Sequence, residues 1–174
     1  MNTNACEFAR RNSMKKTMSL AVRILCLLFV LINGSLHALD LNLELPDLSG
    51  NRVRFSEFSG KWILVHFWAP WCVECIEEFP LLDALKKEHP DLAVVGIAVM
   101  YRNRNQIQEF IKQHPVSFPV LLGTENTAAK FGGFDGLPAS ILFSPDGNLI
   151  LKKEGRMSQG DVEEAMKTNV PHPR

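Results

Sequence analysis

Residues 68–75 read Trp-Ala-Pro-Trp-Cys-Val-Glu-Cys, and this stretch decides the fold. It ends an apolar run of strand length, residues 62–68, and precedes a helical pattern that begins after Cys75. The two cysteines therefore fall on the first turn of a helix, where unpaired backbone N–H groups and the positive end of the helix dipole stabilise a thiolate. A thiolate attacks disulfides, and the short spacing lets Cys72 and Cys75 bond to each other. The stretch predicts a redox-active dithiol–disulfide pair.

Outward from this stretch, strands and helices alternate along the chain. The run at 62–68 is almost continuously apolar, which is typical of a buried central strand. Apolar residues after Cys75 recur with helical spacing, although Pro80 should kink that helix. The other expected elements are an N-terminal hairpin of 41–48 and 53–55, strands at 92–100, 118–122, 139–144 and 149–153, and helices at 103–114, 124–131 and 158–168. This order predicts an α/β fold with a central mixed β-sheet, helices on both faces and antiparallel strands at one edge.

The first 38 residues differ from the rest of the chain. Five basic residues accompany an uninterrupted apolar run at 24–32, and Leu36-His37-Ala38 ends in a small residue suited to cleavage. The run is well short of the roughly 20 apolar residues that a membrane-spanning helix needs. We therefore expect residues 1–38 to be a secretory signal peptide and residues 39–174 to be one domain. Because Leu36 suits a cleavage site poorly, an uncleaved inner-membrane anchor is the alternative.

Charge and cysteine content narrow the class of protein. The 174 residues carry no formal net charge, and removal of residues 1–38 would leave 14 basic and 18 acidic residues, a net charge of −4. No basic excess indicates nucleic acid as a partner. Removal would also leave Cys72 and Cys75 as the only cysteines, which fits a redox centre better than a disulfide scaffold. Zinc needs four ligands, and the scattered histidines form no second paired motif, so no metal is expected.

Several further motifs accompany the cysteine pair. They are Glu-Phe-Pro at 78–80, Gly-Leu-Pro at 136–138 and Ser-Pro-Asp-Gly at 144–147. Together with Phe-Trp-Ala-Pro-Trp-Cys at 67–72, they make residues 39–174 resemble the thioredoxin-like superfamily, and in particular its exported TlpA/ResA branch. The resemblance implies a thioredoxin-like fold with an extra N-terminal β-hairpin and a thiol:disulfide oxidoreductase activity.

The resemblance also implies roles for individual residues. Cys72 matches the exposed nucleophile and Cys75 the buried resolving cysteine of a redox-active disulfide. Pro138 matches a cis-proline that faces the disulfide, although on its own it is also compatible with a trans residue that starts a strand. A cis bond would leave the backbone of Leu137 free to pair with an extended substrate. Trp71 is expected to shield the disulfide and to offer substrates an apolar surface.

His66 departs from the thioredoxin pattern. It stands six residues before Cys72, where thioredoxins carry a buried aspartate. On the strand its side chain should point beneath Cys75, where an imidazole is a candidate acceptor for the proton of the resolving thiol. A buried neutral histidine with one hydrogen bond is the equally open alternative.

Acidic residues surround the second cysteine. The charge of Glu74 opposes a thiolate at Cys72 and partly offsets the helix dipole, which favours a more reducing couple. Alternatively, Glu74 caps the start of the helix and is solvated. Glu77 and Glu78 are expected on a solvated helix face, and Trp68 is expected in the core.

These expectations describe a periplasmic reductase of protein disulfides that works as a monomer without a cofactor. Cys72 attacks the disulfide of a partner, and Cys75 resolves the mixed disulfide. The oxidised product then requires a membrane partner that donates thiol reductant. Apocytochrome c is the leading substrate, by analogy alone.

Three other functions remain open from the sequence. A disulfide oxidase or isomerase of secreted proteins would use the same cysteines, although Glu74 argues against a strong oxidant. A thiol-dependent peroxidase carries Thr or Ser three residues before its cysteine, where this chain has Ala69. A non-catalytic module that binds a metal or a metal-bearing client is the third.

Overall fold

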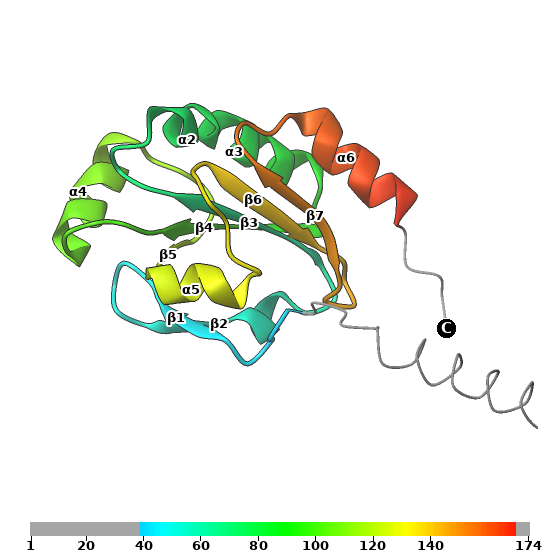
Figure 1. Ribbon diagram of the computed structural model, residues 1–174, viewed down its shortest axis with the longest axis horizontal. Helices are drawn as coiled ribbons and strands as arrows, with labels where there is room; N and C mark the ends of the chain where they lie inside the picture. The colour runs from blue at the N-terminus through cyan, green and yellow to red at the C-terminus, as the bar shows by residue number, and fades with distance from the viewer. Residues whose placement is uncertain (1–38, 170–174) are drawn as a thin grey trace, which may run out of the picture. The chain divides into compact units, whose positions relative to one another are not determined.

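The structure is a computed structural model that describes residues 39–169, so the expected signal segment, 1–38, lies outside the described residues. Its elements follow the expected order (Figure 1). The strands are β1 (Glu44–Pro46), β2 (Arg52–Arg54), β3 (Trp62–Trp68), β4 (Leu92–Ala98), β5 (Val120–Leu122), β6 (Ala139–Phe143) and β7 (Leu149–Glu154). The helices are α2 (Val73–Glu77), α3 (Phe79–Glu88), α4 (Arg104–Gln113), α5 (Glu125–Lys130) and α6 (Gln159–Thr168), with a short 3-10 helix η1 (Phe55–Phe58). Within residues 39–169, no helix is long and apolar enough to cross a membrane.

β3 lies at the centre of a five-stranded mixed sheet with the order β5-β4-β3-β6-β7. The pairs β3–β4 and β4–β5 are parallel, whereas β6 is antiparallel to both β3 and β7. All seven residues of β3 are buried, as a strand covered on both faces requires. The predicted fold class is confirmed, including the antiparallel edge.

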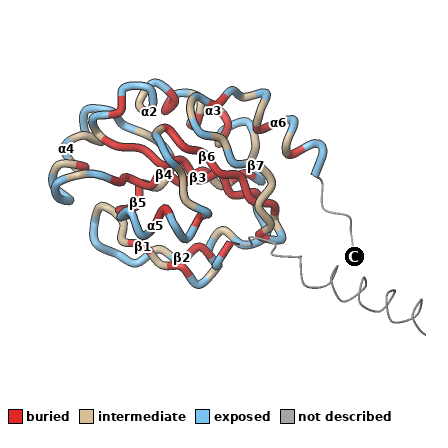
Figure 2. The backbone as a smooth tube through the Cα atoms, in the orientation of Figure 1, coloured by how far each residue is buried: buried red, intermediate tan, exposed pale blue. Residues whose placement is uncertain are grey.

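Alternate residues of β3 belong to two separate cores. Leu64 and Trp68 pack on one face with residues of α3 and α6, whereas Val65 and Phe67 pack on the other with α5 and the N-terminal hairpin. Figure 1 shows α2, α3 and α6 on one side of the sheet, and Figure 2 shows that burial is concentrated in the strands between the layers. Even-numbered residues of β3 therefore face the helices that follow the cysteine pair.

The helix that follows Cys75 is interrupted rather than bent. α2 ends at Glu77 and α3 begins at Phe79, with Pro80 in the first turn of α3. Proline lacks a backbone N–H, and the first turn of a helix is the place where that loss costs least. Glu78 consequently lies at the junction of the two helices.

β1 and β2 form the expected N-terminal hairpin, although β1 is shorter than predicted and β2 begins and ends one residue earlier. Gly50 has a φ of 93° in the connecting turn, a conformation that glycine adopts without steric cost. Asp47 closes the turn, since its Oδ1 accepts hydrogen bonds from the N–H groups of Ser49 and Asn51 at 2.8 Å. Asp47 also forms a backbone bridge to Leu121, so the hairpin lies along β5 at the edge of the main sheet.

Candidate functional site

Cys72 and Cys75 are joined by a disulfide at the start of α2. Cys72 is the N-terminal cap of the helix, and its Sγ accepts a hydrogen bond from the Cys75 N–H at 3.3 Å. Cys72 retains 7% of its exposure, whereas Cys75 is completely buried. On reduction, the helix N-terminus would stabilise a thiolate at Cys72.

Leu137 and Pro138 lie at the same end of the sheet as the cysteines, since Pro138 directly precedes β6 and the cysteines follow its neighbour β3. The peptide bond between them is cis. Ala139, the next residue, pairs with Phe67 near the end of β3, and the chain reaches Cys72 a few residues later. Leu137 is half-buried and contacts both cores. The antiparallel pairing of β3 and β6 thus brings the Leu137–Pro138 segment and the cysteine pair to one end of the molecule.

An apolar rim borders Cys72. Within residues 39–169, the large apolar side chains that are exposed are Trp71 at 62%, Val73 at 67% and Met100 at 50%. The indole N–H of Trp71 donates to the carbonyl oxygen of Met100 at 3.2 Å. Met100 has a φ of 52°, in the left-handed region that side chains other than glycine rarely adopt. Trp71 is recognisable from its place next to Cys72, whereas no local sequence pattern links Met100 to residues so far along the chain.

His66 lies in the middle of β3 and is completely buried. Its Nδ1 is 2.9 Å from the Oγ of Ser140, the residue that pairs with His66 on β6. Its Nε2 has no hydrogen-bond partner in the protein. Burial lowers the pKa of His66 to about 4, and the Cys75 backbone acts in the opposite direction. The ring is therefore neutral at pH 7 and lies beside the backbone of the buried cysteine.

Glu78 corrects the expectation of a solvated helix face. It is 2% exposed, whereas Glu77 is exposed and pairs with Arg156 at 2.7 Å. The Oε1 of Glu78 accepts a hydrogen bond from the Met157 N–H at 2.7 Å, and its Oε2 lies 3.5 Å from Nδ1 of His66. Burial raises the pKa of Glu78, which the Met157 N–H and the Arg156 charge partly oppose. A buried carboxyl group thus lies next to His66.

The spacing of the sequence contains a signal for Glu78. It follows Cys75 by three residues and precedes Leu82 by four, so it shares the inward face of the helical pattern. The adjacent Glu77 hides this signal, because the two glutamates together are typical of a polar helix face.

Glu74 is exposed in the first turn of α2, between the two cysteines. The residue that caps the helix is Cys72, so Glu74 does not have the capping role considered as its alternative. Its carboxylate instead adds negative charge close to the helix N-terminus.

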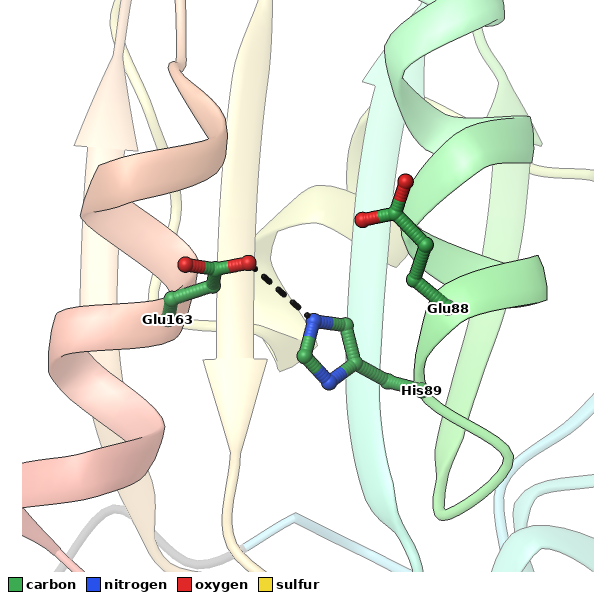
Figure 3. A group of neighbouring side chains, drawn as sticks. All are labelled: Glu88, His89 and Glu163. Atoms are coloured by element: carbon green, nitrogen blue, oxygen red, sulfur yellow. Dashed lines mark hydrogen bonds and ion pairs between the residues drawn. The ribbon is translucent and has the colours of Figure 1, made fainter.

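Three side chains that can ligate a metal converge at the opposite end of α3: Glu88, His89 and Glu163 (Figure 3). Their candidate ligand atoms lie within 4.8 Å of one another. His89 Nε2 is 3.4 Å from Glu163 Oε1, and the side-chain amide of Gln159 donates to Glu88 and to Glu163 at 2.8 Å. These carboxylates already have protein partners, and we assign no metal to them.

The unfolding free energy should decrease between pH 6.5 and pH 4 because of His66. The unfolded histidine takes up a proton in this window, whereas the folded one, with a pKa of about 4, does not, so acidification favours unfolding. A lowering of the pKa from 6.5 to about 4 corresponds to about 3 kcal/mol of unfolding free energy. Glu78 has the opposite effect, because its raised pKa makes the folded state bind a proton first as the pH falls.

Urea unfolding of the parent and of His66→Asn at pH 7 and pH 4 isolates the contribution of the histidine. The parent should lose more stability on acidification than the variant. The same loss of stability in both proteins would contradict the assignment of this pH dependence to His66.

Comparison with known proteins places the chain in a family. The sequence profile of the AhpC/TSA family matches residues 37–152, which is more than half of the chain. The chain therefore belongs to this family of thioredoxin-like proteins.

Its relatives and structural neighbours define the activity. The thiol-disulfide oxidoreductase ResA of Halalkalibacterium halodurans is 30% identical over 134 residues, which cover 75% of this chain and 74% of the relative. ResA of Bacillus subtilis is 28% identical over 131 residues, or 75% of this chain and 73% of the relative. The structure of MTB DsbF in its mixed oxidised and reduced forms superposes with a TM-score of 0.64 at 31% identity, covering 74% of this chain and 95% of that one. The protein is thus a thiol:disulfide oxidoreductase of the ResA and DsbE type.

Proposed function

We propose that the protein is a periplasmic reductase of protein disulfides that acts through Cys72 and Cys75. The observation that carries the proposal is the asymmetry of the pair: Cys72 caps α2 near the surface, whereas Cys75 is completely buried. A client sulfur can approach Cys72 and not Cys75. Cys72 is therefore the nucleophile, and Cys75 is the resolving cysteine.

The proposed reaction moves two electrons from the dithiol to the client. The Cys72 thiolate attacks one sulfur of the client disulfide, and the other client sulfur leaves as a thiolate. Cys75 then attacks the Cys72 sulfur, expels the second client thiolate and closes the Cys72–Cys75 disulfide. His66 is the proposed acceptor for the proton that Cys75 loses. The reaction needs neither a metal nor an organic cofactor.

Trp71, Leu137 and Pro138 form the proposed client surface beside Cys72. The exposed indole of Trp71 offers apolar area, and Met100 extends this area on the side of β4. Leu137 and Pro138 precede β6 at the end of the sheet where the cysteines lie. An extended client segment that carries a cysteine fits this surface, because it can lie against the chain that enters β6 while its sulfur meets Cys72.

The direction of electron flow depends on the reduction potential, which Glu74 should make more negative. Its charge disfavours the Cys72 thiolate and hence the reduced form. Glu74→Gln should therefore raise the potential by roughly 10–20 mV, the size expected for an exposed charge near a helix N-terminus. Equilibration with thiol buffers, followed by tryptophan fluorescence, measures the potential, and Glu77→Gln on the same helix is the matched control.

The same measurement tests the proposed direction. A parent value below about −220 mV supports a reductase, whereas a value near about −120 mV would make the protein an oxidant. An unchanged potential in Glu74→Gln would remove Glu74 from the tuning of the couple.

The proposed cycle requires a donor and a client outside the domain. A reductase in an oxidising compartment must be re-reduced, so we propose a membrane thiol-reductant donor as its partner. Export follows from the signal-like segment at 1–38, which also provides an inner-membrane anchor if it is not cleaved. Apocytochrome c is the proposed client, and the family analogy is its support.

Three assays separate this function from its alternatives. Refolding of a reduced and of a scrambled disulfide protein would detect an oxidase or an isomerase. Consumption of hydrogen peroxide would detect a peroxidase. Submicromolar binding of copper or zinc to the reduced protein, without disulfide reduction, would favour a metal-binding or client-binding module.

A further inference from the structure

We propose that a pocket between the loops that follow β4 and β5 is a client subsite, which takes a basic side chain of the client segment that lies on Cys72. The pocket, called the β4–β5 pocket below, is lined by Met100, Tyr101, Gly123, Thr124, Glu125 and Asn126. The inference rests on the proposed function, because it concerns the peptide whose disulfide Cys72 attacks. It extends that function by naming the class of residue that a client carries beside its reacting cysteine.

The β4–β5 pocket lies at the end of the sheet where the cysteine pair lies. β3, β4 and β5 are parallel, so the chain leaves all three strands at this end. The Val99 N–H donates to the Trp68 carbonyl oxygen at 2.9 Å. The Gly123 N–H donates to the Ala98 carbonyl oxygen at 2.8 Å. The loops that line the pocket and the loop that carries the cysteines therefore start from strand ends that are hydrogen-bonded to one another.

The chain continues from β4 and from β5 to opposite faces of the sheet. Residues of α4, which follows β4, belong to the same core as Cys72 and α3, whereas residues of α5, which follows β5, belong to the other core. Neighbouring parallel strands whose connections leave on opposite faces have a crevice between their carboxyl ends, and ligands of α/β proteins bind in such crevices. Here the crevice has a volume of about 430 Å³, within the range of ligand sites. It can hold one long side chain.

Met100 connects the β4–β5 pocket to the rim beside Cys72. Its carbonyl oxygen accepts the indole N–H of Trp71 at 3.2 Å, and the same residue lines the pocket. Trp71 directly precedes Cys72 in the chain, so the pocket continues the rim. In an extended segment, side chains two positions apart point to the same side and lie about 7 Å apart. A client segment that crosses Cys72 and Trp71 toward Met100 therefore presents to the pocket the side chain two positions from its cysteine.

Three side chains give the pocket its chemical preference. Met100 and Tyr101 supply apolar surface for the methylene stem of a lysine or arginine, and the tyrosine ring attracts its charge. Glu125, in the first turn of α5, is exposed and supplies a carboxylate. Within residues 39–169 this carboxylate has no ion-pair partner, so its charge is available to a ligand. The lining therefore suits a cationic side chain that also buries apolar surface.

The polar groups around the pocket do not favour an anion in the same place. The Thr124 hydroxyl accepts a hydrogen bond from a backbone N–H of α5 at 3.3 Å and so caps that helix. Arg104 acts on Tyr101, but its guanidinium lies against the hairpin turn, with Nη1 2.9 Å from the position of a Cβ on Gly50. Among the lining residues, Glu125 is the one that carries a charge. An acidic client side chain would meet this carboxylate and be repelled.

Stopped-flow reaction of the reduced full-length protein with peptide disulfides measures the preference. Each peptide carries one cysteine joined to thionitrobenzoate, a chromophore that leaves when Cys72 attacks the peptide sulfur. Peptides with lysine two positions before or after the cysteine are compared with otherwise identical peptides that carry glutamine or glutamate there. The second-order rate constant should be about two- to fivefold higher with lysine than with glutamine in one of the two positions, as expected for a partly exposed ion pair. It should be lowest with glutamate.

Substitution of Glu125 tests whether the pocket causes the preference. Glu125→Gln should remove the preference by slowing the reaction with the lysine peptide, and Glu125→Lys should reverse it in favour of glutamate. Glu164→Gln is the matched control, because Glu164 is also exposed and lies on α6, which packs on β7 at the opposite border of the sheet. An undiminished lysine preference in Glu125→Gln, or an equal preference for lysine placed five positions from the cysteine, would overturn the proposal.

A trapped complex shows where the client side chain lies. Cys75→Ser should hold the peptide in a mixed disulfide with Cys72, because the resolving sulfur is missing. Nitrogen-15 NMR of this complex should show shifts of the backbone amides of 123–126 that are larger with the lysine peptide than with the glutamine peptide. Equal shifts with both peptides would overturn the subsite. A reduced parent protein that reacts with none of the peptides would instead contradict the proposed function, so the two failures can be distinguished.

Discussion

Replacing Cys75 with serine should convert the protein into a covalent trap for its clients. Cys72 remains able to attack a client disulfide, but no second sulfur is present to expel the client from the mixed disulfide. Cys72→Ser should instead abolish the reaction, because Cys75 is completely buried and cannot meet a client. The two substitutions remove chemically identical groups, so different outcomes must come from their positions in the fold.

Non-reducing gel electrophoresis and mass spectrometry measure the trap directly. After incubation with a disulfide-bonded peptide, Cys75→Ser should accumulate an adduct of the protein plus one peptide that a reductant dissolves. The double variant Cys72→Ser/Cys75→Ser is the control for nonspecific attachment. An adduct that forms on Cys72→Ser and not on Cys75→Ser would reverse the assigned roles.

Truncation of Trp68 should destabilise the protein by about 3–5 kcal/mol, the usual cost of removing a buried aromatic side chain. Trp68 is completely buried, and its ring lies 5.2 Å from that of Phe79 and 5.3 Å from that of Phe110. Trp68→Ala would therefore leave a cavity between β3, α3 and α4. Urea unfolding at pH 7 measures the loss.

Trp71→Ala provides the comparison, because the same chemical group is removed from the surface. The side chain of Trp71 is 62% exposed, so the free energy of unfolding should change by less than about 0.5 kcal/mol. Its effect should appear instead in the reaction with a peptide disulfide, which should slow if Trp71 contacts clients. Equal destabilisation by the two substitutions would contradict the placement of Trp68 in the core and Trp71 on the rim.

Local patterns were enough to predict the elements that carry the chemistry. The apolar run at 62–68 predicted the central strand, and the cysteine spacing placed the disulfide at a helix start, because each of these features depends on neighbours in the chain. Pro80 was expected to kink a helix, and it stands instead in the first turn of a second helix. Element boundaries follow less directly from such patterns, and β1 and β5 are shorter than their apolar patterns suggest.

The contacts among His66, Glu78 and Ser140 could not be predicted from the sequence, because they join distant residues. His66 and Ser140 are 74 positions apart and meet through the register of β3 and β6. The partner of Glu78 is the backbone of Met157, which has no sequence signature at all. The contact between Met100 and Trp71 likewise uses the carbonyl oxygen of Met100, a group that every residue has.

The N-terminal hairpin has a consequence for the behaviour of the protein at high concentration. Edge strands expose unpaired N–H and C=O groups, which invite pairing with other chains and lead to aggregation. Asp47 bridges to Leu121 and so occupies part of the β5 edge. At the other edge, β7 presents Lys152 and Glu154, charges of the kind that discourage strand addition. Both borders of the sheet therefore carry features that discourage self-association, whereas the proposed client surface beside Cys72 remains open to extended segments.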